Sequence, residues 1–169
     1  GSGNVGATNV MRTAGRTAGV VAFLLDSGKG VLAVLAARAL GQGSPLEALA
    51  AVAAILGHLY PIWLKGKGGK GVATGAGTFL LLAPWPTLLA LLAFALTLAT
   101  VRYVSVASMT GTAVMAALTF GLGSPRPVAW AAAVVAVLIV WKHRSNVRRI
   151  RKGTENRLGS VIPRRSGAG

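Results

Sequence analysis

The stretch Thr87-Leu-Leu-Ala-Leu-Leu-Ala-Phe-Ala-Leu-Thr-Leu-Ala-Thr-Val101 contains no charged residue and ends directly at Arg102. An α-helix needs about 20 predominantly apolar residues to cross the hydrocarbon core of a bilayer. Further apolar runs lie on both sides of this stretch, at Gly19–Leu40, Leu46–Leu64, Val72–Ala83, Val104–Leu122 and Val128–Trp141. The sequence therefore predicts an all-α, polytopic membrane helix bundle with about six membrane segments. The short, glycine-rich Val72–Ala83 run could instead be re-entrant.

The composition also favours lipid over water as the main solvent. Hydrophobic residues make up 53% of the 169 residues, and the mean hydropathy is +0.63. Charged residues make up 12%, whereas soluble domains carry about 25%. The length predicts a single integral membrane domain over residues 1–169. Because the chain has no cysteine and only three acidic residues, we expect no disulfide, no metal site and no cofactor.

The distribution of basic residues predicts the orientation of the chain. The net charge is +15, and basic residues cluster at the ends of the apolar runs. This is the pattern of the positive-inside rule rather than of a nucleic-acid-binding surface. Six crossings would place the first polar segment, the 65–71 segment and a basic tail from about Lys142 on the cytoplasmic side, with only Arg38 and Arg126 near the other face. We therefore expect a lipid bilayer, and no nucleic acid, as a partner.

Three polar blocks interrupt the apolar runs, and the predicted topology brings all three to one face. They are residues 1–12, residues 65–74 and residues 143–155, and they are rich in glycine, asparagine, lysine and arginine. Glycine lets a backbone approach a ligand closely, and N–H groups beside Lys and Arg side chains bind anions. Together the blocks predict one phosphate-handling site assembled from distant parts of the sequence.

Each block also has a simpler interpretation. The first matches G-x-G-x-x-G but lacks the preceding strand of a dinucleotide-binding unit, so we interpret it as an anion-binding loop before a helix rather than a flexible start. The second fails the P-loop pattern at Lys65 and Gly71, which leaves phosphate binding or a solvated basic loop. In the third, His143, Asn146 and Arg149 would share a helix face, either as ligands or as an ordinary basic anchor.

Several polar residues lie inside the predicted spans. Asp26 and Lys29 are three residues apart in an apolar helix, so they either pair with each other or act at the site. His58 is interpreted as structural. Ser105 and Ser108 either bond to their own helix backbone or contribute to the site.

The polar blocks match a known family when they are taken together. Gly-Ser-Gly-Asn-x-Gly-Ala-Thr-Asn-x-x-Arg begins at Gly1, Gly-Gly-Lys-Gly-Val-Ala-Thr begins at Gly68, and His-Arg-x-Asn-x-x-Arg-x-x-x-Gly-x-Glu begins at His143. In this order and spacing they resemble the bacterial membrane acyl-phosphate:glycerol-3-phosphate acyltransferases, the PlsY family. The resemblance extends to about Leu158. Gly66 departs from it, because the family usually has a bulkier residue there, and this puts the local loop shape in question.

The resemblance implies an enzyme of the bacterial cell (inner) membrane with its active site at the cytoplasmic face. It would transfer a fatty acyl group from acyl phosphate to the 1-hydroxyl group of sn-glycerol 3-phosphate, giving lysophosphatidic acid and phosphate. Family members have seven helices, so the first helix would be missing here. The two substrates are the expected partners, and no obligate protein partner is evident. The alternative is a membrane transporter of a phosphorylated solute, which would favour mid-membrane sites and internal repeats.

The resemblance also implies roles for individual residues. Catalytic roles fall on Ser2, Arg12, His143 and Asn146. Substrate-binding roles fall on Asn4, Thr8, Gly69, Lys70, Gly71, Ser108 and Arg149. The residues themselves, rather than the resemblance, give structural roles to Asp26, Lys29 and Glu155; Glu155, the only acidic residue of the tail, is expected to pair with arginines and hold the tail in shape. His143 would either accept the hydroxyl proton or only orient the substrate.

Overall fold

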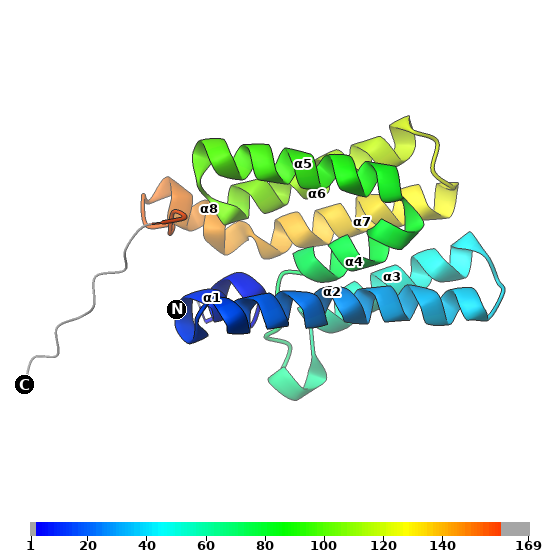
Figure 1. Ribbon diagram of the computed structural model, residues 1–169, viewed down its shortest axis with the longest axis horizontal. Helices are drawn as coiled ribbons and strands as arrows, with labels where there is room; N and C mark the ends of the chain where they lie inside the picture. Colours follow the sequence, from blue (N-terminus) through cyan, green and yellow to red (C-terminus); the bar gives the residue numbers. More distant parts are fainter. Residues whose placement is uncertain (1–2, 160–169) are drawn as a thin grey trace, which may run out of the picture.

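The computed structural model describes residues 3–159, which fold entirely into helices and the loops that join them (Figure 1). Ser2, to which the resemblance gives a catalytic role, lies outside the described residues. The helices are α1 (Ala7–Ala14), α2 (Arg16–Ala39), α3 (Ser44–Leu59), the 3-10 turn η1 (Ile62–Leu64), α4 (Val72–Leu82), α5 (Pro84–Val101), α6 (Val104–Gly121), α7 (Arg126–Lys142) and α8 (Arg144–Arg151).

All six predicted apolar runs form helices, so the predicted all-α membrane bundle is confirmed. Within residues 3–159, four helices are long and apolar enough to cross a membrane: α2, α3 continued by η1, α5 and α6. A fifth is added if α7 and α8, which are bent by 46° relative to each other, form one span. The chain is therefore a multi-pass membrane protein in which α4 is the short member.

Several helix ends differ from the predicted ends by two to five residues, and proline explains two of these differences. α5 begins at Pro84 rather than at Thr87, because proline suits the first turn of a helix, where its missing N–H is not needed. α3 ends at Leu59 rather than at Leu64, because the residue before Pro61 disfavours the helical conformation.

The outer surface of the bundle is apolar. Leu25, Leu32 and Val137 are 68%, 67% and 70% exposed, and many other large apolar side chains face outward with them. A contiguous apolar surface of this kind would be unfavourable in water, but it matches hydrocarbon.

α4 packs inside the bundle against α2, α3 and α5, and its length sets the position of the second polar block. It has 11 residues, which corresponds to about 16 Å, against about 30 Å for the hydrocarbon core. Only Ala83 separates its end from α5. The end of α4 and the start of α5 are therefore level with each other. Since α4 is shorter than α5, its own start does not reach the polar end of the bundle, and Lys70 and Gly71, just before α4, lie in a recess between the longer helices.

Small residues allow α2 and α4 to approach closely. A Cβ atom added at Gly30 would meet the backbone oxygen of Thr74, and one added at Gly77 would meet the backbone of Ser27. Such close backbone approach gives van der Waals contact that larger side chains would prevent. The abundance of glycine in these spans thus has a direct packing role.

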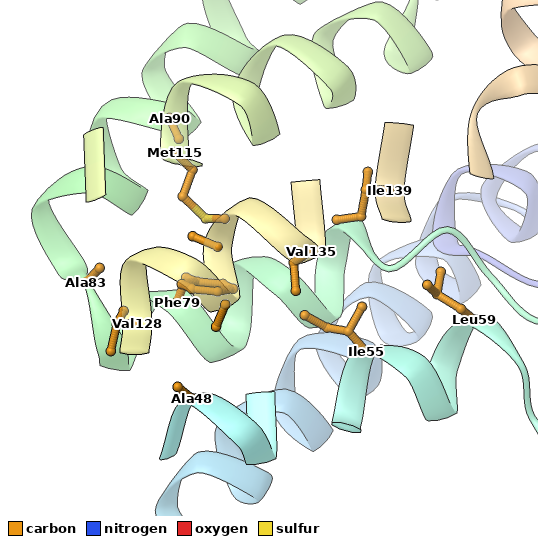
Figure 2. Packing of buried hydrophobic residues seen from close by; sticks show 12 residues of the cluster. Ala48, Ile55, Leu59, Phe79, Ala83, Ala90, Met115, Val128, Val135 and Ile139 are labelled. Atoms are coloured by element: carbon orange, nitrogen blue, oxygen red, sulfur yellow. The ribbon is translucent and has the colours of Figure 1, made fainter. Parts of the chain in front are cut away.

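The core joins the two layers of the bundle. Figure 2 shows Ile55 of α3 and Phe79 of α4 packed beside Val135 and Ile139 of α7, with Met115 of α6 above them. Ile55, Phe79 and Val135 are fully buried. α7 and α4 therefore hold α5 and α6 against α2 and α3.

The polar blocks gather at one end of the bundle, as the predicted topology requires. In Figure 1, α1, α8 and the turn between α5 and α6 lie at the same end, whereas the α2–α3 and α6–α7 turns lie at the opposite end. Residues far apart in the sequence therefore meet beside the start of α4.

Candidate active site

A cavity of about 170 Å³ lies at the polar end of the bundle and is lined by residues from all three polar blocks. Its polar side chains are Asn4, Thr8, Asn9, Arg12, Asp26, His58, Lys70, Ser105, Ser108, His143, Asn146, Arg149 and Glu155. Apolar walls come from Phe23, Val72, Phe94 and Val104. Of the predicted site residues that the structure describes, Gly69 and Lys29 do not line this cavity.

A chain of short hydrogen bonds crosses the centre of the site. Lys70 Nζ donates to Asn146 Oδ1 at 2.5 Å, and Asn146 Nδ2 donates to Glu155 Oε1 at 2.6 Å. Because an ammonium group only donates and a carboxylate only accepts, the Asn146 amide is fixed in one orientation between them. The second and third blocks are thereby connected through a single side chain.

Glu155 is the acceptor at the end of this series of hydrogen bonds. Besides Asn146, it accepts hydrogen bonds from Ser105 Oγ at 2.9 Å and from Arg149 Nε at 2.7 Å. Burial acts to raise the pKa of the Glu155 carboxyl, but the hydrogen bonds from Asn146, Arg149 and Ser105 outweigh it, so the pKa lies below its ordinary value. Glu155 is therefore a carboxylate that joins α6, α8 and the segment after α8.

Lys70 has unusual electrostatics for a lysine. Burial, together with the nearby positive charges of Arg149 and Arg12, lowers its pKa to about 8, although the Glu155 carboxylate acts in the opposite direction. A phosphate bound beside it would supply the missing negative charge and restore the ammonium form. The site thus has a deficit of negative charge that an anionic ligand would fill.

The loop before Lys70 rests on His58. A Cβ atom at Gly69 would overlap the His58 imidazole, and the Gly69 N–H donates to the His58 backbone oxygen at 3.1 Å. Gly71 has a φ of 84°, a left-handed conformation that favours glycine, and it begins α4. Gly69 therefore allows close packing beneath the site, whereas Gly71 lines the cavity itself.

His58 is held in turn by the charged pair within α2. Lys29 Nζ donates to Asp26 Oδ1 at 2.6 Å and to His58 Nδ1 at 2.6 Å. The Asp26–Lys29 pair that the sequence left open is thus present, and Asp26 and His58 also line the cavity. This cluster supports the Lys70 loop from below.

The first block is tied to the second by Asn4. Its side-chain amide donates to the Gly68 backbone oxygen at 3.2 Å and accepts from the Gly6 N–H at 2.8 Å. Asn4 also lines the cavity, although both ends of its amide are occupied in this way. The contact places the start of α1, with Thr8, against the site.

Arg12 is the cation that this block contributes. Its guanidinium makes no hydrogen bond or ion pair with any of residues 3–159, yet it lines the cavity. The backbone N–H groups of Ala7 and Thr8 lie in the first turn of α1, where helical N–H groups have no partner within the helix. Together these donors form a surface suited to an anion.

His143 is buried at the junction of α7 and α8. Its Nδ1 lies 2.8 Å from the Ile139 backbone oxygen, which can only accept a hydrogen bond. Nδ1 therefore carries the proton, and in the neutral ring Nε2 is an acceptor. This tautomer can receive a hydrogen bond from a hydroxyl group in the cavity.

A narrow apolar groove opens from the cavity between α4, α5 and α6. It has a volume of about 50 Å³ and shares Val72, Phe94 and Ser108 with the cavity. Ser108 Oγ donates to the backbone oxygen of Val104 at 2.8 Å, so this serine both bonds to its own helix and faces the junction. The site is therefore polar on one side and apolar on the other.

Three polar residues that line the cavity were not among the predicted site residues: Asn9, His58 and Ser105. His58 was interpreted as structural from its place in a span, but it also lines the cavity. Ser105 was left undecided, and it bonds to Glu155. Its spacing of three residues from Ser108, which places both on one helix face, was the available signal.

Comparison with known proteins identifies the family of this arrangement. The family model described as glycerol-3-phosphate acyltransferase matches residues 1–153. Glycerol-3-phosphate acyltransferase of Anaeromyxobacter dehalogenans (strain 2CP-1 / ATCC BAA-258) is 47% identical over 163 residues, which cover 94% of this chain and 81% of that protein. The protein of the same name from Geobacter sulfurreducens is 47% identical over 158 residues, again with 94% and 81% coverage.

Two solved structures are also similar to this chain. They are crystal structures of PlsY (YgiH), an integral membrane glycerol 3-phosphate acyltransferase, in a glycerol 3-phosphate form and a lysophosphatidic acid form. The TM-scores are 0.89 and 0.87, with 41% and 40% sequence identity. The first covers 94% of this chain and 80% of that chain, and the second 94% and 81%.

Proposed function

The chain belongs to the glycerol-3-phosphate acyltransferase family, and from this premise we propose that it transfers a fatty acyl group from an acyl phosphate to the 1-hydroxyl group of sn-glycerol 3-phosphate. The products are lysophosphatidic acid and inorganic phosphate. The observation that carries the proposal is the cavity in which Arg12, Lys70 and Arg149 meet from three distant blocks, beside an apolar groove. Two phosphate-bearing substrates, one with an acyl chain, match this combination.

The acyl phosphate is the substrate that needs both sides of the site. Its chain would lie in the apolar groove past Val72 and Phe94, and its phosphate would lie in the cavity near Arg12 and the first turn of α1. A planar guanidinium can bind two phosphate oxygens at once. A thioester substrate would bring no phosphate to the reacting carbonyl. Arg12 and the N–H groups of α1 would then have no negative charge to neutralise there.

Glycerol 3-phosphate would take the opposite side of the cavity. Its phosphate would interact with Lys70 and Arg149, which the hydrogen bonds of Asn146 and Glu155 hold in position. Bound in this way, its 1-hydroxyl group would lie near His143 Nε2. Such positioning converts a reaction between two separate molecules into one within a single complex.

The chemistry then needs one bond to form and one to break. The hydroxyl oxygen attacks the acyl carbonyl carbon, and the bond from that carbon to the phosphate oxygen breaks, which releases phosphate. The hydroxyl group donates a hydrogen bond to His143 Nε2, which orients it, and its proton passes to the departing phosphate, directly or through water. Because phosphate leaves readily, stabilisation of its growing charge by Arg12 matters more than a strong base.

The orientation of the site follows from charge. The polar end of the bundle contains Lys65, Lys67, Lys70, Arg102 and the basic segment from Lys142, and the positive-inside rule assigns such an end to the cytoplasm. We place the protein in the bacterial inner membrane on this basis. The position of the cavity at one end of the bundle also disfavours the alternative of a solute transporter, whose site would lie near the middle.

A direct assay tests the proposed function. Purified protein in lipid is given an acyl phosphate and glycerol 3-phosphate, and formation of lysophosphatidic acid and release of phosphate are measured together. We expect the two products in equal amounts, and no comparable rate when acyl-CoA replaces the acyl phosphate. Phosphate release without lysophosphatidic acid, or equal rates from acyl-CoA, would contradict the proposal.

A further inference from the structure

A second, strongly basic cavity lies beside the active-site cavity. It has a volume of about 260 Å³ and lies between the 65–71 loop and α8. Its lining residues are Gly3, Asn4, Lys67, Gly68, Gly69, Lys70, Lys142, Arg144, Ser145, Arg148 and Arg149. Six of these are basic and, as far as the structure describes the chain, none is acidic. We call this cavity the cationic cleft.

The cationic cleft is continuous with the active site. Asn4, Lys70 and Arg149 line both cavities, so they form the passage between them. Asn4 is fixed there by its hydrogen bond to Gly68. An anion in the cleft is therefore next to Lys70 and Arg149, which also line the active-site cavity.

Besides Lys70 and Arg149, which bond to Asn146 and Glu155, two more of the cleft's cations have structural contacts. Lys142 Nζ donates to the Leu59 backbone oxygen at 2.8 Å and lies 4.1 Å from the centre of the Tyr60 ring. The Arg144 guanidinium lies 4.6 Å from the centre of the Trp141 ring. These contacts hold the end of α7 and the start of α8, and they account for both side chains.

Lys67 and Arg148 have no such explanation. Both are exposed at the rim of the cleft, and neither side chain makes a hydrogen bond or ion pair with another residue between positions 3 and 159. Like charges placed together raise the free energy of the folded protein unless an anion neutralises them. Their position at the rim of a cleft that leads to Lys70 is the feature that needs a function.

We propose that the cationic cleft is the entrance by which small phosphate anions dissolved in water reach the active site, with Lys67 and Arg148 attracting them at its mouth. The proposal rests on the proposed function only for the identity of the anion, glycerol 3-phosphate. The apolar groove joins the cavity through a different set of residues, Val72, Phe94 and Ser108. The water-soluble acceptor and the lipid-like donor thus have separate entrances and do not compete for one.

The physical consequence is a capture rate that depends on ionic strength. A cleft lined by charges of one sign concentrates ligands of the opposite sign and speeds up their association. The attraction extends about 10 Å at 0.1 M salt but only about 3 Å at 1 M. Cations at the rim of a binding site change association more than the events that follow binding. The cleft should therefore affect kcat/KM for glycerol 3-phosphate and leave kcat nearly unchanged.

The test uses the Lys67→Gln/Arg148→Gln double variant in vesicles of zwitterionic phosphatidylcholine, so that lipid charge does not contribute. At low ionic strength we expect kcat/KM for glycerol 3-phosphate to fall by about tenfold, with kcat and the KM for acyl phosphate little changed. At 1 M salt the difference from the unmodified protein should almost disappear. A loss that persists at high salt, or an equal fall in kcat, would overturn the proposal.

The matched control is the Arg151→Gln/Lys152→Gln double variant. It removes the same charge from the end of α8, but neither residue lines the cleft. We expect its kcat/KM to stay within twofold of that of the unmodified protein. An equal fall in both variants would show that the net charge of the protein, and not the position of Lys67 and Arg148, causes the effect, and would overturn the proposal. Equal unfolding temperatures of the two variants show that folding is not the cause of the difference.

A third measurement separates this proposal from the proposed function. Inorganic phosphate is titrated as an inhibitor, and its inhibition constant should rise in the Lys67→Gln/Arg148→Gln variant by the same factor as kcat/KM falls. An unchanged inhibition constant would overturn the proposal that the cationic cleft is the entrance, while continued formation of lysophosphatidic acid would leave the proposed function standing. Failure of the proposed function would appear instead as the absence of lysophosphatidic acid from the unmodified protein.

Discussion

Replacing Gly69 with alanine tests whether the second polar block must touch His58 in order to place Lys70. The added Cβ would overlap the imidazole ring. The ring is buried and held by Lys29, so the loop rather than the ring should move. Since ordinary contact begins at 3.4 Å, relief requires a shift of about 1 Å or more, and a misplacement of this size can cost about 100-fold in rate. Overpacking should also lower the free energy of unfolding by about 1–3 kcal/mol.

The assay measures kcat/KM for glycerol 3-phosphate and thermal unfolding on the same preparation. The control is Gly28→Ala, because a Cβ at Gly28 would meet open space; we expect that variant to behave like the unmodified protein. In the double variant Gly69→Ala/His58→Ala the overlap is removed, so part of the lost rate should return. Activity of Gly69→Ala within twofold of the unmodified protein would refute the reasoning, because Lys70 would then not depend on this contact.

Two further predictions concern the cations of the site. Arg12→Lys should lower kcat/KM by about 100-fold while the protein still inserts and purifies normally, because an ammonium cannot bind two phosphate oxygens as a guanidinium does; near-normal turnover would instead make Arg12 a residue of charge bias. The lowered pKa of Lys70, about 8, means that this lysine loses its charge at a lower pH than an ordinary lysine, so kcat/KM for glycerol 3-phosphate should fall as pH rises through about 8. In Lys70→Arg, whatever its absolute rate, this alkaline fall should be absent because guanidinium stays charged, and an unchanged profile would assign the fall to another group.

Much of the architecture could be predicted because membrane helices are specified by local composition. The six apolar runs gave the helices, and counting crossings placed the three polar blocks at one end. The helix ends at Leu59 and Pro84 differed from the predicted ends because proline acts over one or two residues, a finer scale than hydropathy.

The details of the site were less predictable because they depend on contacts between distant residues. Nothing in the sequence near Asn4 indicates that its amide will bond to Gly68. Likewise, the pattern around Glu155 suggested an arginine partner, but not that Asn146 and Ser105 would share the same carboxylate. His58 shows the same limit, since its partners Lys29 and Gly69 lie on α2 and in the loop before α4. Residue type predicted the chemistry of the site, and three-dimensional packing determined which atoms meet.

The shortness of α4 fixes the depth at which the reaction takes place. α4 has 11 residues and α5 has 18, so the recess above α4 is about 10 Å deep. Because α5 is itself about 27 Å long, close to the roughly 30 Å thickness of the hydrocarbon core, the floor of the recess lies at the level of the acyl chains, where the chain of the proposed donor already resides. One extra helical turn in α4 would lift Lys70 by about 5 Å, away from Asn146. The length of α4 therefore sets the depth of the site in the membrane. At that depth a water-soluble acceptor and a lipid-soluble donor can meet without either leaving its own solvent.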